Sequence, residues 1–142
     1  MKDPNILKFL IKERTLVLDG AMGTMIQKHK FSEEDYRGTR FSDYNILLKG
    51  NNDLLSLTQP KSILNIHREY LEAGADIIMT NTFSSTPIAM ADYKMESLVY
   101  DLNFESAQLA KKAVLEYDSE EKPRFIAGSI GPTNKTASMS PD

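Results

Sequence analysis

A single carboxylate, Asp19, stands between an apolar run at residues 16–18 and a glycine-containing turn at residues 20–24. A short apolar run before turn residues is typical of a buried strand, so Asp19 would lie at the carboxyl end of that strand. In parallel α/β folds, ligands bind at this edge of the sheet. Asp19 is therefore a candidate for binding a cationic or hydrogen-bond-donating group. The alternative is that Asp19 only caps the turn or the helix that follows.

Two further apolar runs, at residues 75–80 and 125–130, also end in polar turns, which contain Asn81 and Ser129. Their side chains could bond a ligand, or they could close turns by bonding their own backbone. If the three ends lie on one edge of a parallel sheet, they converge and favour a small polar ligand. No nucleophile with a paired base accompanies them, so the residues alone predict no catalytic group.

The sequence offers no thiolate metal site and no disulfide, because it contains no cysteine. Its two histidines, His29 and His67, have no partner pattern. His67 falls on or beside the apolar face of a predicted helix, where a lone histidine is more often a structural residue than a ligand. We therefore predict no metal site within this chain.

The elements that must position these residues alternate between strands and helices. Ala75–Thr80 and Phe125–Ile130 read as strands like residues 16–18, and apolar spacing predicts the helices between them. The pattern predicts an α/β fold with three βα units of a parallel sheet. The predicted helices are a short packing helix that begins at Asp3 and Pro4, a helical turn at Met22–Ile26, a helix from Pro60 to the stop at Gly74, and one at Leu98–Tyr117.

The segment at residues 28–50 mixes charges, aromatics and glycines without a sustained period. We interpret it as a long surface excursion within a single domain of residues 1–142, and as a candidate lid or rim of a site. The alternative is a solvated insertion anchored by a few aromatic side chains. A chain of 142 residues is also far too short for a complete α/β barrel.

Charge and hydropathy exclude two classes of partner. The net charge of −3 comes from interspersed acids and bases, and there is no basic stripe of the kind that nucleic-acid binding needs. The sequence shows no signal-peptide pattern and no apolar run long enough to cross a bilayer. We expect a cytoplasmic protein that binds neither nucleic acid nor membrane.

Four separated motifs lie in order along the chain: Leu18–Gln27, Gly50–Asp53 with Leu57–Pro60, Ala73–Phe83 and Gly128–Thr133. Together they resemble the N-terminal homocysteine-binding domain of the cobalamin-dependent methionine synthases, from about Leu16 to Asp142. The Asp19-Gly20 opening is shared with other homocysteine methyltransferases, such as those that use betaine or S-methylmethionine. The longer stretch through Gln27 and the Asn51-Asn52-Asp53 segment favour the cobalamin-dependent family.

This resemblance implies a (β/α)₈ TIM barrel in which zinc, held by cysteines of later strands, binds the homocysteine sulfur as a thiolate. The thiolate would take a methyl group from methylcobalamin, which is regenerated from 5-methyltetrahydrofolate, and methionine would form. By the same resemblance, Asp19 lies near the substrate's ammonium group. Gly20 and Ala21 supply backbone donors near its carboxylate, and Asn81 and Ser129 line the same pocket.

The chain departs from that family pattern, because it lacks cysteine and stops after the third predicted strand. We therefore expect an incomplete barrel fragment that binds neither zinc nor cobalamin and is inactive alone. Its partners would be the rest of the barrel and the folate and cobalamin domains, and its exposed sheet edge would favour self-association. The alternative is a stand-alone α/β module that binds a small anion or another protein.

Overall fold

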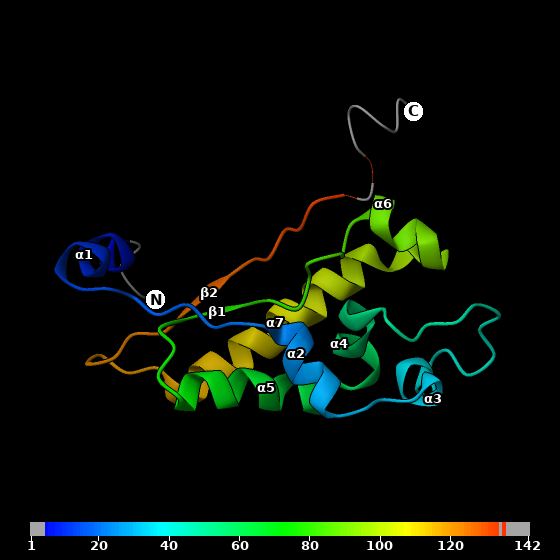
Figure 1. The fold of residues 1–142 in the computed structure, drawn as a ribbon. Coiled ribbons are helices and arrows are strands. Elements are labelled where there is room, and N and C mark those ends of the chain that lie inside the picture. The colour runs from blue at the N-terminus through cyan, green and yellow to red at the C-terminus, as the bar shows by residue number, and fades with distance from the viewer. Residues whose placement is uncertain (1–4, 134, 136–142) are drawn as a thin grey trace.

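The computed structural model describes residues 5–133 and residue 135 (Figure 1). The predicted helix cap at Asp3 and Pro4 lies outside these residues. Among the described residues, the strand segments run side by side through the middle of the molecule, and the longest helices lie against one side of them (Figure 1).

The sheet consists of two parallel strands, β1 (Ile77–Met79) and β2 (Phe125–Ala127). Ile77 pairs with Phe125 and Met79 with Ala127, so the two strands are parallel, as predicted. The prediction of a full third strand at residues 16–18 is wrong, because this segment joins β1 only through a single parallel bridge between Leu18 and Ile77.

Two carboxylates explain why this first segment forms only one bridge. The amide of Val17 donates to the carboxylate of Asp76 at 2.8 Å. At the other end, the amide of Met79 donates to Oδ2 of Asp19 at 3.0 Å. Both amides are at positions where a parallel ladder would bond a backbone carbonyl. Side-chain oxygens take the place of those carbonyls, so the ladder ends at both sides of the bridge.

Helices α5 (Pro60–Glu72) and α7 (Val99–Tyr117) cover one face of the sheet, and both match the predicted helices. Small side chains on α7, at Ser106, Ala110 and Ala113, are fully buried and allow the helix to lie close to its neighbours. One hydrophobic core forms between these helices and β1, and it contains Leu64, Leu71, Ala75, Ile78, Ala110, Ala113 and Val114.

A second core lies beside α2 (Met22–Lys28), α3 (Glu33–Arg37), η1 (Asn52–Leu54) and α4 (Leu55–Thr58). It contains Ile26, Tyr36, Leu48, Leu54, Leu55, Ile63, Ile66, Met90, Met95 and Leu102. Helix α2 confirms the helical turn that was predicted at Met22–Ile26.

The segment at residues 28–50 contributes to this second core through Tyr36 and Leu48. Ser32 caps α3 in a reciprocal capping box with Asp35, which fixes where the helix begins. The carboxylate of Glu33 accepts from the amide of Leu48 at 2.8 Å and so ties the end of the segment to α3. A role of this segment as a lid or rim stays a prediction.

Helix α1 (Ile6–Glu13) forms as predicted, but the expectation that it packs is wrong. None of its residues is buried, and Phe9 and Ile11 are each 60% exposed. Residues 14–16 carry the chain from α1 to the bridge, and Figure 1 shows the helix standing apart from the layer of α5 and α7. Arg14 at its end is held by a bidentate ion pair with Asp76, so a polar contact rather than apolar packing ties this helix to the sheet.

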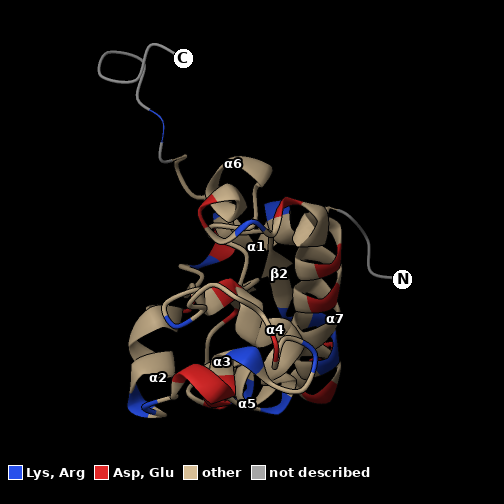
Figure 2. Cartoon of the chain, turned by 90° about the vertical axis from the view of Figure 1, so that its right-hand side faces the viewer, with Lys and Arg blue, Asp and Glu red and all other residues tan. Residues whose placement is uncertain are grey.

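Three short elements, α6 (Pro87–Met90), η2 (Ala91–Tyr93) and η3 (Glu96–Leu98), lead into α7. Acidic and basic residues are scattered over the face shown in Figure 2, and the basic residues drawn there form no stripe. Within the described part of the chain, no helix combines the length and the apolar character needed to cross a membrane.

Candidate functional site

The five predicted site residues lie around one cavity of about 190 Å³, which we call the strand-end cavity. The segment after the bridge, the end of β1 and the loop after β2 all reach it, as the parallel arrangement of their strands requires. The residues that line it are Asp19, Gly20, Ala21, Met22, Gly23, Met79, Thr80, Asn81, Phe83 and Ser129.

Asp19 is 8% exposed, and its carboxylate is oriented by the hydrogen bond that Oδ2 accepts from Met79. The other oxygen, Oδ1, is buried and has no partner among the described residues. The capping alternative is wrong, because Ala21 occupies the N-cap of α2 and no side chain caps that helix. Burial raises the pKa of Asp19 to about 6, and the bond from Met79 opposes this shift.

Gly20 and Ala21 join Asp19 to α2, and both are exposed at the cavity. A Cβ on Gly20 would lie 3.8 Å from the hydroxyl of Tyr70, which comes from α5. The pKa of Tyr70 is raised, first by burial and then by the negative charge of Asp19. The sequence pattern assigns Tyr70 no position in the site, so this neighbour of Asp19 was not predicted.

Asn81 uses its side-chain amide inside the protein. The amide nitrogen donates to the backbone oxygen of Asn52 at 2.9 Å and to the hydroxyl of Ser56 at 3.2 Å. The backbone amide of Asn81 donates to Ser106 at 2.7 Å. Asn81 thereby joins the end of β1 to η1, α4 and α7, and its contact with a ligand stays a prediction.

Hydroxyl groups join the ends of β1 and β2. Thr80 and Thr82 share a hydrogen bond of 2.7 Å between their hydroxyls. The amide of Ser129 donates to Thr80 at 3.0 Å, and Thr82 donates to the carbonyl of Ser129 at 2.8 Å. These bonds hold the end of β1 to the loop after β2, and Ser129 takes part in them through its backbone. Ser129 also lines the cavity, and its contact with a ligand stays a prediction.

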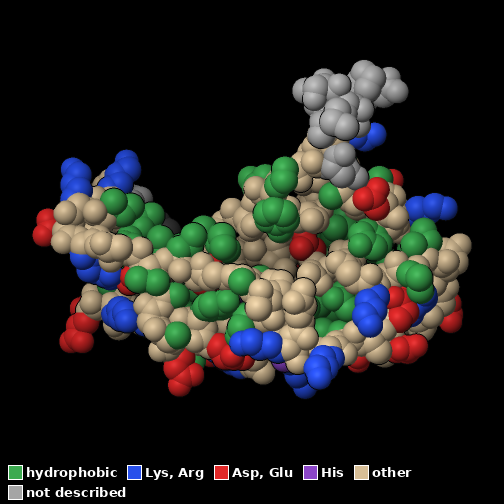
Figure 3. Space-filling view, in the orientation of Figure 1, with side chains coloured by type: hydrophobic (Ala, Val, Ile, Leu, Met, Phe, Trp, Pro, Cys, Tyr) green, Lys and Arg blue, Asp and Glu red, His purple; other side chains and the backbone are tan. Residues whose placement is uncertain are grey.

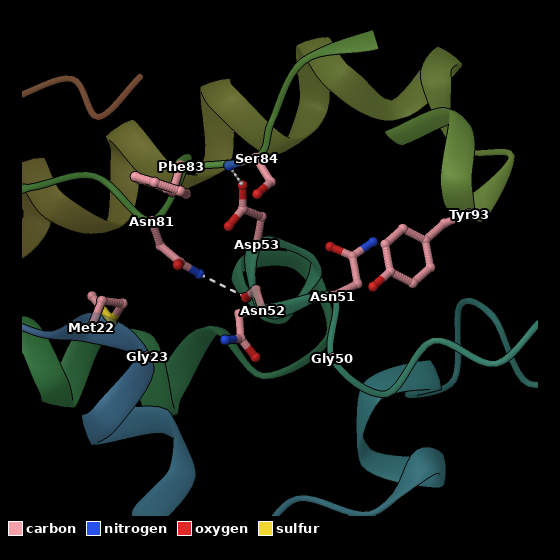
Figure 4. Close-up of a pocket in the computed structure, with 10 residues that line it drawn as sticks. All are labelled: Met22, Gly23, Gly50, Asn51, Asn52, Asp53, Asn81, Phe83, Ser84 and Tyr93. Atoms are coloured by element: carbon pink, nitrogen blue, oxygen red, sulfur yellow. Dashed lines mark hydrogen bonds between the residues drawn. The ribbon is translucent and has the colours of Figure 1, made fainter. Parts of the chain in front are cut away.

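A second cavity of about 240 Å³, which we call the Asp53 cavity, adjoins the first and shares Met22, Gly23, Asn81 and Phe83 with it. Figure 4 shows Asp53 from η1 and Tyr93 from η2 on its wall. Asp53 is 4% exposed, and burial raises the pKa of its carboxyl group. Asp53 belongs to the Gly50–Asp53 motif, and the sequence pattern does not place this motif in the site.

The histidines lie outside both cavities. His67 is fully buried with no partner for either ring nitrogen in the described structure, and burial lowers its pKa to about 4. His29 is exposed and stacks on Phe31. No cluster of three or more His, Cys, Asp or Glu residues among the described residues could hold a metal ion. The donor set therefore does not fit a thiolate-bound zinc, since the chain has no cysteine.

Comparison with known proteins adds a family and a fold. Residues 16–142 match the family model for homocysteine S-methyltransferase. The fold is similar to crystal structures of the homocysteine methyltransferase MmuM from Escherichia coli in its oxidized and metallated forms, with TM-scores of 0.68 and 0.67 and 25% sequence identity to each. The matches cover 89% of this chain but only 40% and 41% of those proteins.

Proposed function

The chain belongs to the homocysteine S-methyltransferase family, and on this basis we propose that its strand-end cavity binds one side of homocysteine for methylation to methionine. The substrate's ammonium group would bind to Asp19, and its carboxylate would face the backbone of Gly20 and Ala21. Asn81 and Ser129 would complete the wall on the side of β1 and β2.

The buried, unpartnered Oδ1 of Asp19 carries this proposal. Burying a carboxylate oxygen without a partner is costly, and an ammonium group would supply both a hydrogen bond and an opposite charge. With a pKa of about 6, the carboxyl group is mostly ionised at neutral pH, which suits a cationic partner. The bond from Met79 orients the carboxylate before the ligand arrives.

The dimensions and lining of the cavity support a small amino acid. Drug-sized ligands occupy pockets of roughly 300–1,000 Å³, whereas this cavity measures about 190 Å³. Met22, Met79 and Phe83 provide apolar surface beside the polar groups. An amino acid with a short aliphatic side chain combines both kinds of surface.

We assign the methyl donor as methylcobalamin, regenerated from 5-methyltetrahydrofolate, on the motifs at Leu18–Gln27 and Gly50–Asp53. Zinc would hold the homocysteine sulfur as a thiolate in the complete enzyme. The residues of this chain do not fit that zinc, so no step at sulfur is assigned to them. Their part is to bind and orient the amino-acid end of the substrate.

The chain spans about 40% of the length of the solved structures that it matches. We propose that it forms the first part of a TIM barrel and works with the rest of that barrel and with folate- and cobalamin-binding domains in the cytoplasm. Alone, it would bind neither zinc nor cobalamin and would be inactive.

Titration calorimetry with homocysteine tests the proposed site in the complete gene product. We expect Asp19→Ala to weaken binding by about tenfold or more, because a charge-assisted hydrogen bond is lost. The matched control is Asp43→Ala, which removes an exposed carboxylate from residues 28–50. Unchanged affinity in Asp19→Ala would contradict the assignment. Retention of small anions with no preference for homocysteine would favour the stand-alone module.

A separate assay tests the donor. The complete protein would be supplied with homocysteine and with methylcobalamin, betaine or S-methylmethionine in turn, and methionine would be quantified. We expect methionine to form from homocysteine with methylcobalamin and with neither of the other two donors. Turnover with betaine or S-methylmethionine would instead place the chain with those homocysteine methyltransferases.

A further inference from the structure

Asp53 belongs to the Gly50–Asp53 motif, to which the proposed function gives no task. Its carboxylate is buried at η1, and it accepts two hydrogen bonds through the same oxygen. The amide of Ser84 donates to Oδ2 at 2.7 Å, and the hydroxyl of Ser85 donates to Oδ2 at 2.8 Å. Both donors lie in the loop that follows β1, so Asp53 holds this loop from a distant part of the sequence.

The same two segments are joined a second time. The side-chain amide of Asn81 donates to the backbone oxygen of Asn52, the residue before Asp53. Figure 4 draws this bond and the bond from Ser84 to Asp53, and their donors precede and follow Phe83 in the sequence. Residues 81 and 84 are thus both fastened to η1, with Phe83 between them.

The position of Phe83 depends on these bonds, because its side chain is not buried. The residue is 57% exposed, yet it lines both cavities. Its carbonyl accepts from the amide of Gly131 at 2.9 Å. A Cβ on Gly131 would lie 2.5 Å from that carbonyl oxygen and 2.8 Å from the ring, so there is little room on the side of β2. The backbone of the loop after β1 therefore fixes the position of the Phe83 ring.

We propose that Asp53 is a positioning residue that holds the loop at residues 80–86, and with it Phe83 and Asn81, at the wall of the strand-end cavity. Without the carboxylate, the amide of Ser84 and the hydroxyl of Ser85 lose their acceptor. Phe83 is then held less firmly at the wall. The occupant of that cavity is homocysteine, and this part rests on the proposed function.

Three variants of the complete gene product test the proposal. Asp53→Asn weakens the acceptor with little change of shape. Ser85→Ala removes only one of the two donors and leaves Asp53 in place. Asp43→Asn is the control, because it makes the same chemical change at an exposed position. Circular dichroism checks that each variant keeps its helices.

The first readout is hydrogen exchange of the Ser84 amide, measured without ligand. We expect exchange about tenfold faster in Asp53→Asn, because the amide of Ser84 then donates to an uncharged acceptor and the hydrogen bond is weaker. A smaller increase is expected in Ser85→Ala and none in Asp43→Asn. The second readout is homocysteine affinity, which we expect to fall about tenfold in Asp53→Asn and to be unchanged in Asp43→Asn.

A third readout separates this role from a general structural one. The chemical shift of the Ser84 amide proton should follow the ionisation of Asp53, whose pKa is raised, and this titration should disappear in Asp53→Asn. Tyr93 from η2 is the ionisable neighbour, and its own pKa is raised above 10.0, so it stays neutral in the range where Asp53 titrates.

Faster exchange of Ser84 together with weaker homocysteine binding supports the proposal. If Asp53→Asn matches Asp43→Asn in exchange and affinity while the parent protein binds homocysteine, the positioning role is overturned and the proposed function stands. If the parent protein does not bind homocysteine, the proposed function fails, and the exchange of Ser84 still decides the role of Asp53. If Asp53→Asn does not fold, unchanged Ser84 exchange in Ser85→Ala overturns the proposal.

Discussion

The two carboxylate oxygens of Asp19 have opposite effects on the stability of the fold. Its Oδ2 ends the pairing with β1, and its Oδ1 stays buried without a partner. An ionised carboxylate in this position destabilises the fold until a ligand supplies the missing donor. Sites of this kind give up stability for binding.

Asp19→Asn should therefore stabilise the chain while it weakens homocysteine binding. The pKa of Asp19 is raised from 3.8 to about 6, so stability is fully present below the ordinary pKa and is lost as the pH rises through about 6. Because Asn does not ionise, we expect the variant to gain about 1–2 kcal/mol at pH 8 and to match the parent near pH 4. Thermal unfolding at both pH values measures this; an equal difference at pH 4 and pH 8 would argue against it.

His67 provides the opposite pH dependence. Burial lowers its pKa from 6.5 to about 4, so stability is fully present above the ordinary pKa and falls as the pH drops from 6.5 towards 4. The unpartnered ring nitrogens also make the neutral ring costly to bury.

We expect His67→Leu to remove this loss and to gain about 2 kcal/mol over the parent by pH 5. Denaturant unfolding between pH 7 and pH 5 tests the prediction. His29→Gln serves as the control, because it replaces the exposed histidine and leaves His67 in place. The rise in stability that Asp19 gives as the pH falls through about 6 should remain in His67→Leu. A loss of stability from pH 7 to pH 5 that persists in this variant would contradict the assignment to His67.

At the scale of elements, periodicity predicted what local spacing can encode. The apolar faces of α5 and α7 follow from residues such as Ile63, Ile66 and Leu102, which recur at helical spacing and are fully buried. Short apolar runs likewise predicted β1 and β2, though both strands are shorter than their runs.

The contacts that shape the site could not be predicted in this way, because they join residues far apart in the sequence. The bond from Val17 to Asp76 spans 59 positions, and the bond from Met79 to Asp19 spans 60. Asp53 is likewise 31 positions from Ser84. A carboxylate in a turn looks the same in the sequence whether it bonds a neighbour, a distant amide or a ligand.

The connection between α1 and the sheet depends on one such carboxylate. Asp76 is 2% exposed and accepts from both Arg14 and Val17, and the Arg14 guanidinium lowers the pKa of Asp76 to about 2. A lowered pKa means that this stability is present above the ordinary value near 4 and is lost as the pH falls towards 2.

Asp76→Asn should cost about 2 kcal/mol at neutral pH, discounted for the partial exposure of Arg14. Urea unfolding measures the loss. The matched control is Asp101→Asn, which removes a surface ion pair with Arg40 and should cost no more than about 0.5 kcal/mol. Equal losses of stability in Asp76→Asn and Asp101→Asn would mean that the bidentate pair stabilises the fold no more than a surface ion pair does.

At the scale of the whole molecule, several apolar side chains are exposed to solvent on β2 and on the segments next to the two strands. Val17, Leu18, Ile126 and Ile130 are 55%, 49%, 39% and 88% exposed. Figure 3 shows hydrophobic side chains gathered along the hollowed side of the molecule between α1 and α6. Among the described residues, β1 is the only strand that pairs with β2, so β2 is an edge strand of the sheet. Such edges favour pairing with another chain.

We therefore expect the 142-residue chain to self-associate through β2 and the open face beside it. Ile126→Lys places a charge at the centre of β2, where it opposes edge pairing, and should shift the protein towards monomer in sedimentation velocity. Leu115→Lys is the control, because Leu115 is 68% exposed on α7 and lies outside the open face, so its association should match the parent. A parent chain that sediments as a compact monomer and unfolds cooperatively would contradict this expectation, since the exposed strand edge would then be stable in water.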